Sequence, residues 1–198
     1  MDNDANLMCL AESRLGAARG LRHAVCLTLG TGVGGGIIAD GKLYRGANNA
    51  TGEVGHLPIN EDGPRCNCRG KACLETYIGN NRILAQVKKM FGRSIPLEEV
   101  SRLAAGGNKK AIALWSGVGE HLGVALVGVV NLLNPEAIVI GGGVANDGKV
   151  LFDKVKEVIR KRAMTVQARQ VKVYKAKLGS AAGLIGAAVM VKEASPKR

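Results

Sequence analysis

The fold is decided by the run Ala24-Val25-Cys26-Leu27-Thr28-Leu29-Gly30-Thr31-Gly32-Val33-Gly34-Gly35-Gly36, followed by Ile37-Ile38-Ala39-Asp40-Gly41-Lys42-Leu43-Tyr44. The apolar segment 24–29 predicts a buried strand. Asp40-Gly41 lies between two further short runs and predicts a tight hairpin turn. Residues 24–44 are therefore expected to form a strand, a glycine loop, a second strand, a turn and a third strand.

The glycine loop 30–36 has two interpretations. It contains the spacing G-x-G-x-x-G, but a strand is expected after it instead of the helix that a dinucleotide site requires, and it lacks the Gly-Lys-Ser/Thr of a P-loop. Its backbone N–H groups can still approach an anion closely, with the Thr31 hydroxyl as an added donor. The alternative is a bulged hairpin that needs glycine for backbone reasons only.

The rest of the chain predicts an α/β domain. Residues 137–140 form a continuously apolar run, typical of a strand buried on both faces, and Gly141-Gly142-Gly143 follow it directly. The alternating run 171–176 predicts a half-exposed strand. Helices are expected over 5–19, 74–91, 95–105, 109–133, 149–162 and 181–192, the last capped by Ser180. A hairpin meander followed by strand–helix repeats predicts one domain, a mixed sheet with helices on both faces.

A cluster of thiols and one imidazole predicts a metal site. Cys66, Cys68 and Cys73 fall within eight residues, and His56 lies just upstream. Sulfur and imidazole nitrogen are ligands that tetrahedral zinc selects, and four protein ligands favour a structural ion over a catalytic one. Glu53 and Glu75 flank the cluster. The alternatives are ordinary loop cysteines or a disulfide framework, and the lack of a signal-like N-terminus argues against disulfides.

Composition limits the possible partners. The chain has 198 residues, of which 46% are hydrophobic and only 3% aromatic, and its net charge is +12. An excess of cations suits anionic partners, but the cations are scattered and few aromatics exist on which bases could stack, so nucleic acid is not an expected partner. No membrane span is expected, because the best apolar run is interrupted by Glu120, His121 and Asn131. Cys9 and Cys26 are expected to be buried.

At this point several motifs together resemble the ROK family of sugar kinases and repressors. They are Asn3-Asp4-Ala5-Asn6, Leu29-Gly30-Thr31-Gly32-Val33-Gly34-Gly35-Gly36, Gly52-Glu53-Val54-Gly55-His56, Cys66-x-Cys68-x4-Cys73-Leu74-Glu75 and Ile140-Gly141-Gly142-Gly143. They occur in the family's order over nearly the whole chain. The resemblance implies an RNase H-like, actin/hexokinase-type fold with a zinc-binding loop insertion. Residues 1–198 would then correspond to the large C-terminal lobe of such a kinase.

The resemblance also implies a reaction, the ATP-dependent phosphorylation of a hexose 6-hydroxyl. Asp4 would be the catalytic base, while Asn3, Glu53, His56 and Glu75 would bind the sugar. Gly30, Thr31 and Gly32 would lie along the ATP phosphates, and Gly142 and Gly143 beside the adenosine. Zinc held by His56, Cys66, Cys68 and Cys73 would be structural, and Mg²⁺ would accompany ATP, although Asp4 is the only evident ligand for it. Asp4 has a plainer interpretation as a helix N-cap, and taken alone its position favours that cap.

The sequence departs from the family pattern at three points. Asn67, Arg69 and Ala72 stand where family members usually carry glycine, and Asp2 stands where a glutamate usually precedes the Asn-Asp pair. The family's N-terminal lobe, with its phosphate loop, is not found before Met1. We therefore expect little or no kinase activity from this chain alone. We also expect an exposed apolar face on the final helix, covered by self-association.

Glucose is the expected sugar, but N-acetylglucosamine, N-acetylmannosamine and fructose kinases share these motifs. A homodimer and a cytoplasmic location are also expected. Two other functions stay open. The first is a fragment of a sugar-sensing ROK repressor, and the second is a non-catalytic binding domain stabilised by zinc.

Overall fold

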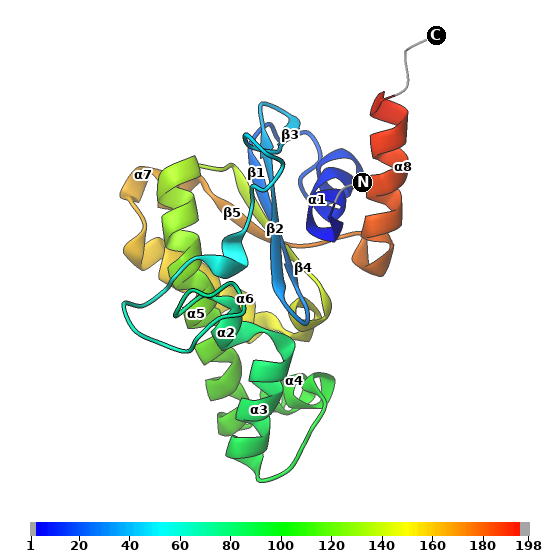
Figure 1. The fold of residues 1–198 in the computed structure, drawn as a ribbon. Coiled ribbons are helices and arrows are strands. Elements are labelled where there is room, and N and C mark those ends of the chain that lie inside the picture. Colours follow the sequence, from blue (N-terminus) through cyan, green and yellow to red (C-terminus); the bar gives the residue numbers. More distant parts are fainter. Residues whose placement is uncertain (1–2, 195–198) are drawn as a thin grey trace.

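The computed structural model describes residues 3–194, with only the backbone described at 146 and 147. Five strands form one sheet in the order β3-β2-β1-β4-β5 (Figure 1). The strands are β1 Ala24–Leu29, β2 Val33–Ala39, β3 Lys42–Tyr44, β4 Ala137–Gly141 and β5 Lys172–Lys175. β1 pairs antiparallel with β2 and parallel with β4, and β4 pairs parallel with β5. The predicted mixed sheet is confirmed.

Eight α-helices and three short 3₁₀ turns complete the described chain. The helices are α1 Asp4–Leu15, α2 Glu75–Ile78, α3 Asn80–Phe91, α4 Leu97–Ala105, α5 Lys109–Leu133, α6 Lys149–Arg162, α7 Thr165–Gln170 and α8 Ala182–Ala194. The turns are η1 Val54–His56, η2 Gly143–Asp147 and η3 Gly179–Ala181.

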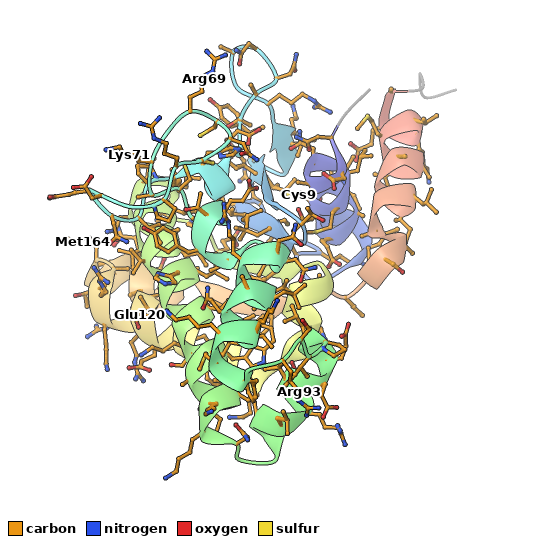
Figure 2. The ribbon with its side chains drawn as sticks, turned by 60° about the horizontal axis from the view of Figure 1, so that its bottom comes forward. Cys9, Arg69, Lys71, Arg93, Glu120 and Met164 are labelled. Carbon is orange, nitrogen blue, oxygen red and sulfur yellow. The ribbon has the colours of Figure 1, made fainter. Side chains whose placement is uncertain are left out.

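Alternating side chains of the central strand build a core on each face of the sheet. Val25, Leu27 and Leu29 join the core formed with α5 and α6, while Ala24 and Cys26 join the smaller core formed with α1 and α8. Figure 1 accordingly shows α1 and α8 on one side of the sheet and α5 to α7 on the other. Cys9 of α1 is fully buried in the smaller core (Figure 2), and Cys26 is buried with it, as predicted.

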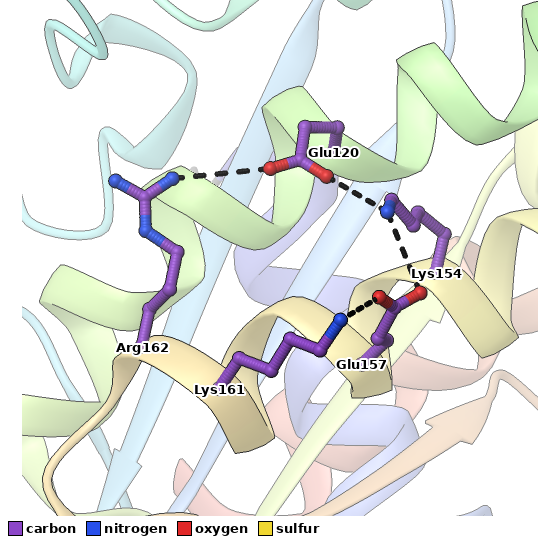
Figure 3. Close-up of polar contacts among 5 residues, drawn as sticks. All are labelled: Glu120, Lys154, Glu157, Lys161 and Arg162. Carbon is purple, nitrogen blue, oxygen red and sulfur yellow. Dashed lines mark hydrogen bonds and ion pairs between the residues drawn. The ribbon is translucent and has the colours of Figure 1, made fainter.

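The helix α5 packs closely on α6 because glycine faces the contact. A Cβ at Gly123 would lie 2.6 Å from the Cβ of Val158, and one at Gly119 would lie 2.8 Å from the Cβ of Lys154. Ion pairs from Glu120 to Lys154 (3.1 Å) and to Arg162 (3.9 Å) bridge the same two helices (Figure 3). Among the described residues α5 is long and apolar enough to cross a membrane by length and composition alone, but half of its most apolar window is buried in this core.

Several expected boundaries differ from the structure. The helix expected over 74–91 is broken at Gly79, where the backbone is extended, and α7 was not predicted. The glycine loop is shorter than expected, because Gly34, Gly35 and Gly36 belong to β2 and pair with Thr28, Leu27 and Cys26. Ser180 lies inside η3 and does not cap α8, which begins at Ala182. The long helix ends as predicted, with Asn134 in the left-handed conformation.

Candidate functional site

One cavity of about 540 Å³ collects most of the predicted site residues. It opens between the start of α1, the turn that joins β1 to β2, and η1. The site residues that line it are Asn3, Asp4, Gly30, Thr31, Gly32, Glu53, His56, Glu75 and Gly142. Segments more than 70 residues apart along the chain therefore meet around one space.

The start of α1 argues against the N-cap interpretation of Asp4. Asn3, not Asp4, is the N-cap, and its side-chain oxygen accepts the Asn6 N–H at 2.7 Å. Asp4 is the first helical residue, is exposed at the cavity, and accepts the N–H of Ala5 through Oδ1 at 2.9 Å. A carboxylate in the first turn of a helix is favoured by the helix dipole. The N-cap role expected for Asp4 is therefore filled by its neighbour.

Glycine lets the turn and η1 approach each other at this cavity. The Glu75 side chain reaches under the turn and accepts the Val33 N–H through Oε2 at 2.9 Å. A Cβ at Gly32 would lie 2.4 Å from that same oxygen. A Cβ at Gly55 would lie 2.1 Å from the Val33 carbonyl oxygen, so η1 docks directly on β2. This docking brings Glu53 and His56 to the cavity wall.

The four predicted metal ligands form one compact group. The donor atoms of His56, Cys66, Cys68 and Cys73 all lie within 4.8 Å of one another. The Cys68 and Cys73 sulfur atoms are 3.6 Å apart, and the Cys66 sulfur is 3.6 Å from His56 Nδ1. Tetrahedral zinc with bonds of about 2.3 Å to sulfur and about 2.0 Å to nitrogen requires separations of this size. The residues present therefore fit a zinc ion.

The loop that carries the thiols is held by several backbone hydrogen bonds of its own, among them those from the Cys66 N–H to the Gly70 carbonyl and from the Ala72 N–H to the Pro64 carbonyl. It has two isolated β-bridges, Pro58 with Cys73 and Arg65 with Lys71. Figure 2 shows Arg69 and Lys71 on the outer side of this loop. Burial raises the pKa of Cys73 to about 12, whereas the backbone N–H of Gly70 lowers the pKa of the exposed Cys68. A metal that binds all three thiols must therefore displace protons.

The backbone explains why glycine is usual in the family at two of the three positions where this loop carries Asn67, Arg69 and Ala72. Arg69 has φ +72° and Ala72 has φ +55°, both in the left-handed region that glycine adopts most readily. Asn67 is not among the residues with positive φ. Arg69 and Ala72 thus adopt a left-handed backbone conformation that glycine adopts with less strain. The departure at Asp2 lies outside the described residues.

The two predicted adenosine glycines differ in their surroundings. Gly142 has φ +91°, and a Cβ there would lie 2.2 Å from the Leu29 carbonyl oxygen, so glycine is required for packing on β1. Gly142 lines the cavity, whereas Gly143 is not among its lining residues and has open space around its Cβ position. Of the two predicted adenosine glycines, the cavity therefore includes only Gly142.

Two features of the site were missed by reasoning from sequence. Thr28 lines the cavity, and its hydroxyl within an otherwise apolar strand was an available signal. Glu12 is fully buried on α1 and accepts the N–H groups of Ala17, Lys177 and Leu178 at 2.6–2.8 Å. Glu12 thereby fixes the helix that carries Asp4 to the connection between β5 and α8. No spacing in the sequence marks it.

Sheet order, two helical layers and a cavity at the β1–β2 turn define an actin/hexokinase-like fold, and solved ROK hexokinases match it. The chain belongs to the ROK family, whose model matches residues 1–194. It is 32% identical to a glucokinase of Thermotoga maritima over 98% of this chain and 65% of that protein. It is also 32% identical to a xylose repressor of Caldicellulosiruptor bescii, over 96% of this chain and 51% of that protein.

A solved structure gives the same result. The glucokinase of Streptomyces griseus, in complex with glucose and AMPPNP, matches with a TM-score of 0.88 and 30% identity over 98% of this chain and 68% of that one. The chain thus spans about half to two thirds of the length of these relatives. It corresponds to their C-terminal part.

Proposed function

We propose that this chain is the C-terminal lobe of a sugar kinase that transfers the γ-phosphoryl group of ATP to the 6-hydroxyl of a hexose, with glucose as the first candidate. The observation that supports it is the single cavity lined by Asp4, by Glu53, His56 and Glu75, and by the glycine turn. An acid-base group, sugar-binding groups and a phosphate-binding turn are the parts that this reaction requires.

Asp4 acts as the general base in this proposal. The hexose 6-hydroxyl oxygen attacks the γ-phosphorus, its proton passes to the Asp4 carboxylate, and ADP leaves with the bridging oxygen. A base positioned in this way contributes ~10²–10⁴-fold to the rate. Asn3, beside it, holds a neighbouring hydroxyl. Its side-chain oxygen caps α1, so the same amide couples sugar binding to the helix start.

Glu53, His56 and Glu75 hold the hydroxyls on the other side of the sugar ring. His56 directs Nδ1 toward the thiols, while Nε2 lies 3.9 Å from Glu53 Oε2 at the cavity. A ring nitrogen fixed by a metal leaves the other nitrogen as a defined donor. Zinc, when bound, supplies a cross-link that orders the loop. It takes no part in phosphoryl transfer.

The nucleotide lies along the turn from Gly30 to Gly32, with the Thr31 hydroxyl on a phosphate and the adenosine beside Gly142 and Gly143. Mg²⁺ arrives with ATP. Among the described residues the Cys/His group is the only cluster of three or more metal-ligating side chains, and we assign Asp4 of the cavity as the candidate ligand for Mg²⁺. A homodimer and a cytoplasmic location, which keeps these thiols reduced, complete the proposal.

Sugar binding is tested on the chain itself by isothermal titration calorimetry with glucose, N-acetylglucosamine, N-acetylmannosamine and fructose. Phosphoryl transfer is tested in a fusion that places the N-terminal part of the Thermotoga maritima glucokinase before Met1. We expect turnover by the fusion and a loss of ~10²–10⁴-fold with Asp4→Asn, at unchanged sugar affinity. Equal turnover by the Asp4→Asn fusion would refute the role of Asp4.

A sugar-sensing repressor is the second candidate, because repressors occur among the relatives at the same identity as kinases. It predicts sugar binding without turnover in the fusion, together with retention on DNA at moderate salt. A zinc-stabilised scaffold predicts no heat with either sugar or ATP. The calorimetry and the fusion assay therefore separate the three functions.

A further inference from the structure

A second cavity lies far from the sugar site, along the open edge of the sheet. It has a volume of about 380 Å³ and is lined by residues of α6, α7 and β5. Its apolar wall comprises Ile159, Val171 and Val173, and its cations are Lys156, Arg160 and Lys172. We call this the β5 groove. No residue of the proposed kinase site lines it.

The cations of the β5 groove have no acidic partner among the described residues. The acids of α6 are engaged elsewhere, since Asp153 pairs with Lys149 at 2.6 Å and Glu157 pairs with Lys154 and Lys161 (Figure 3). Lys156 and Arg160 are four residues apart on one helix face, where like charges destabilise a helix. The groove therefore holds three exposed positive charges without local compensation.

The floor of the groove is the edge of a sheet. β5 is the last strand in the sheet order, so one of its sides has no neighbouring strand within residues 3–194. The Lys172 N–H donates to Glu136 and the Ala176 N–H donates to Ile140, both on the β4 side. Because successive residues of a strand alternate, Val173 and Lys175 direct their N–H and C=O groups to the open side. An open edge of this kind accepts an added strand.

We propose that the β5 groove binds an extended acidic segment of a partner protein, which adds to the sheet beside β5. Its backbone bonds to Val173 and Lys175, and its carboxylates pair with Lys156, Arg160 and Lys172. A second copy of this chain does not fit, because a symmetric pairing would bring the same cations face to face. Nucleic acid is disfavoured, since Tyr174 is the only aromatic side chain lining the groove.

Lysines on an edge strand also have a simple role, which is to prevent edge-to-edge aggregation. That role accounts for Lys172 and Lys175 on β5. It does not account for Lys156 and Arg160, which reach the groove from a helix.

The test is fluorescence anisotropy with the 198-residue chain and a labelled short peptide of alternating glutamate and valine. We expect saturable binding at low salt, weakened about tenfold by Lys156→Glu with Arg160→Glu, which reverses the charge at two contacts. Lys88→Glu with Lys89→Glu changes the net charge equally at the far end of α3, and we expect it to bind like the wild type. Equal weakening of peptide binding by both double variants would overturn the proposal, because the loss of affinity would then follow from the change in net charge alone.

Two further probes separate strand addition from other binding. The same peptide with alternate backbone nitrogens methylated keeps its charge but loses its N–H donors, and we expect it to bind at least several-fold more weakly. Equal binding of the methylated peptide, or tighter binding of an oligothymidylate of equal charge, would overturn the proposal. Far-ultraviolet circular dichroism and urea denaturation of both double variants check the fold, and we expect both variants to fold like the wild type.

Discussion

A single added methyl group at Gly32 probes the architecture of the proposed sugar site. Gly32 is not among the residues with positive φ, so alanine does not meet the strain of a left-handed backbone there. Its Cβ would nevertheless lie 2.4 Å from Glu75 Oε2, and the carboxylate must move. Movement breaks the 2.9 Å hydrogen bond from the Val33 N–H and withdraws Glu75 from the cavity.

The magnitude follows from that one contact. A hydrogen bond to a charged acceptor is worth about 1.5–3 kcal/mol, and a Gly→Ala change returns about 0.4–1 kcal/mol through the unfolded chain. Gly32→Ala is therefore expected to lower the free energy of unfolding by about 1–2 kcal/mol. If Glu75 makes a similar bond to the sugar, the Kd for sugar rises ~10–100-fold.

The assay is urea denaturation with calorimetry of sugar binding on the same samples. Gly117→Ala is the matched control, because nothing lies within 4 Å of its Cβ position on α5. That control should gain about 0.5–1 kcal/mol of stability and keep its sugar affinity. Unchanged sugar affinity in Gly32→Ala, with normal folding, would refute the placement of Glu75 in the sugar site.

Four further predictions concern other parts of the molecule. Glu12→Gln replaces a buried acceptor of three N–H groups and should cost about 2–3 kcal/mol in urea denaturation, whereas the exposed Glu98→Gln should change stability little. The backbone N–H groups of His23 and Arg22 lower the pKa of Glu136. The Glu136 carboxylate therefore stabilises the fold above the ordinary glutamate pKa of about 4.3, and this stabilisation is lost as the pH falls through the lower pKa of the folded state. The difference in free energy of unfolding between wild type and Glu136→Gln should shrink over that pH range, and a difference that grows toward acid pH would contradict the prediction. Removal of zinc by a chelator should lower the melting temperature and the sugar affinity of the wild type but should leave those of Cys68→Ser unchanged. Equal effects of the chelator on the wild type and on Cys68→Ser would exclude the Cys/His group as the zinc site. Leu184 and Val191 are 80% and 68% exposed on α8. Replacing both by lysine should reduce self-association measured by light scattering. A wild-type chain that stays monomeric at high concentration would contradict self-association through α8.

The regular part of the fold was predictable because local patterns and packing agree. The apolar runs of β1 and β4 lie where they were expected, and α5 and α6 begin and end at the predicted residues. In these segments the period of the apolar side chains matches the face that is buried. The resemblance to a family then located the site, and the cavity brings most of those residues together.

Other features depend on contacts that no local pattern records. Gly34 to Gly36 were expected in a loop, but they form a strand because α1 packs against them, and a Cβ at Gly36 would lie 2.6 Å from the Cβ of Cys9. Residue type alone could not decide whether Asn3 or Asp4 is the N-cap of α1, since both residue types are good N-caps. A glutamate on α1 is expected at the surface from its residue type, but the connection between β5 and α8 covers Glu12 and donates the Lys177 and Leu178 N–H groups to it.

The central claim is that Asp4 and the zinc-loop residues face the same sugar molecule. The most direct measurement is a crystal structure of the chain with bound glucose. We predict that the Asp4 carboxylate and at least two of Glu53, His56 and Glu75 contact the same glucose. Glucose bound outside this cavity, or in contact with only one of the two sides, would contradict the account.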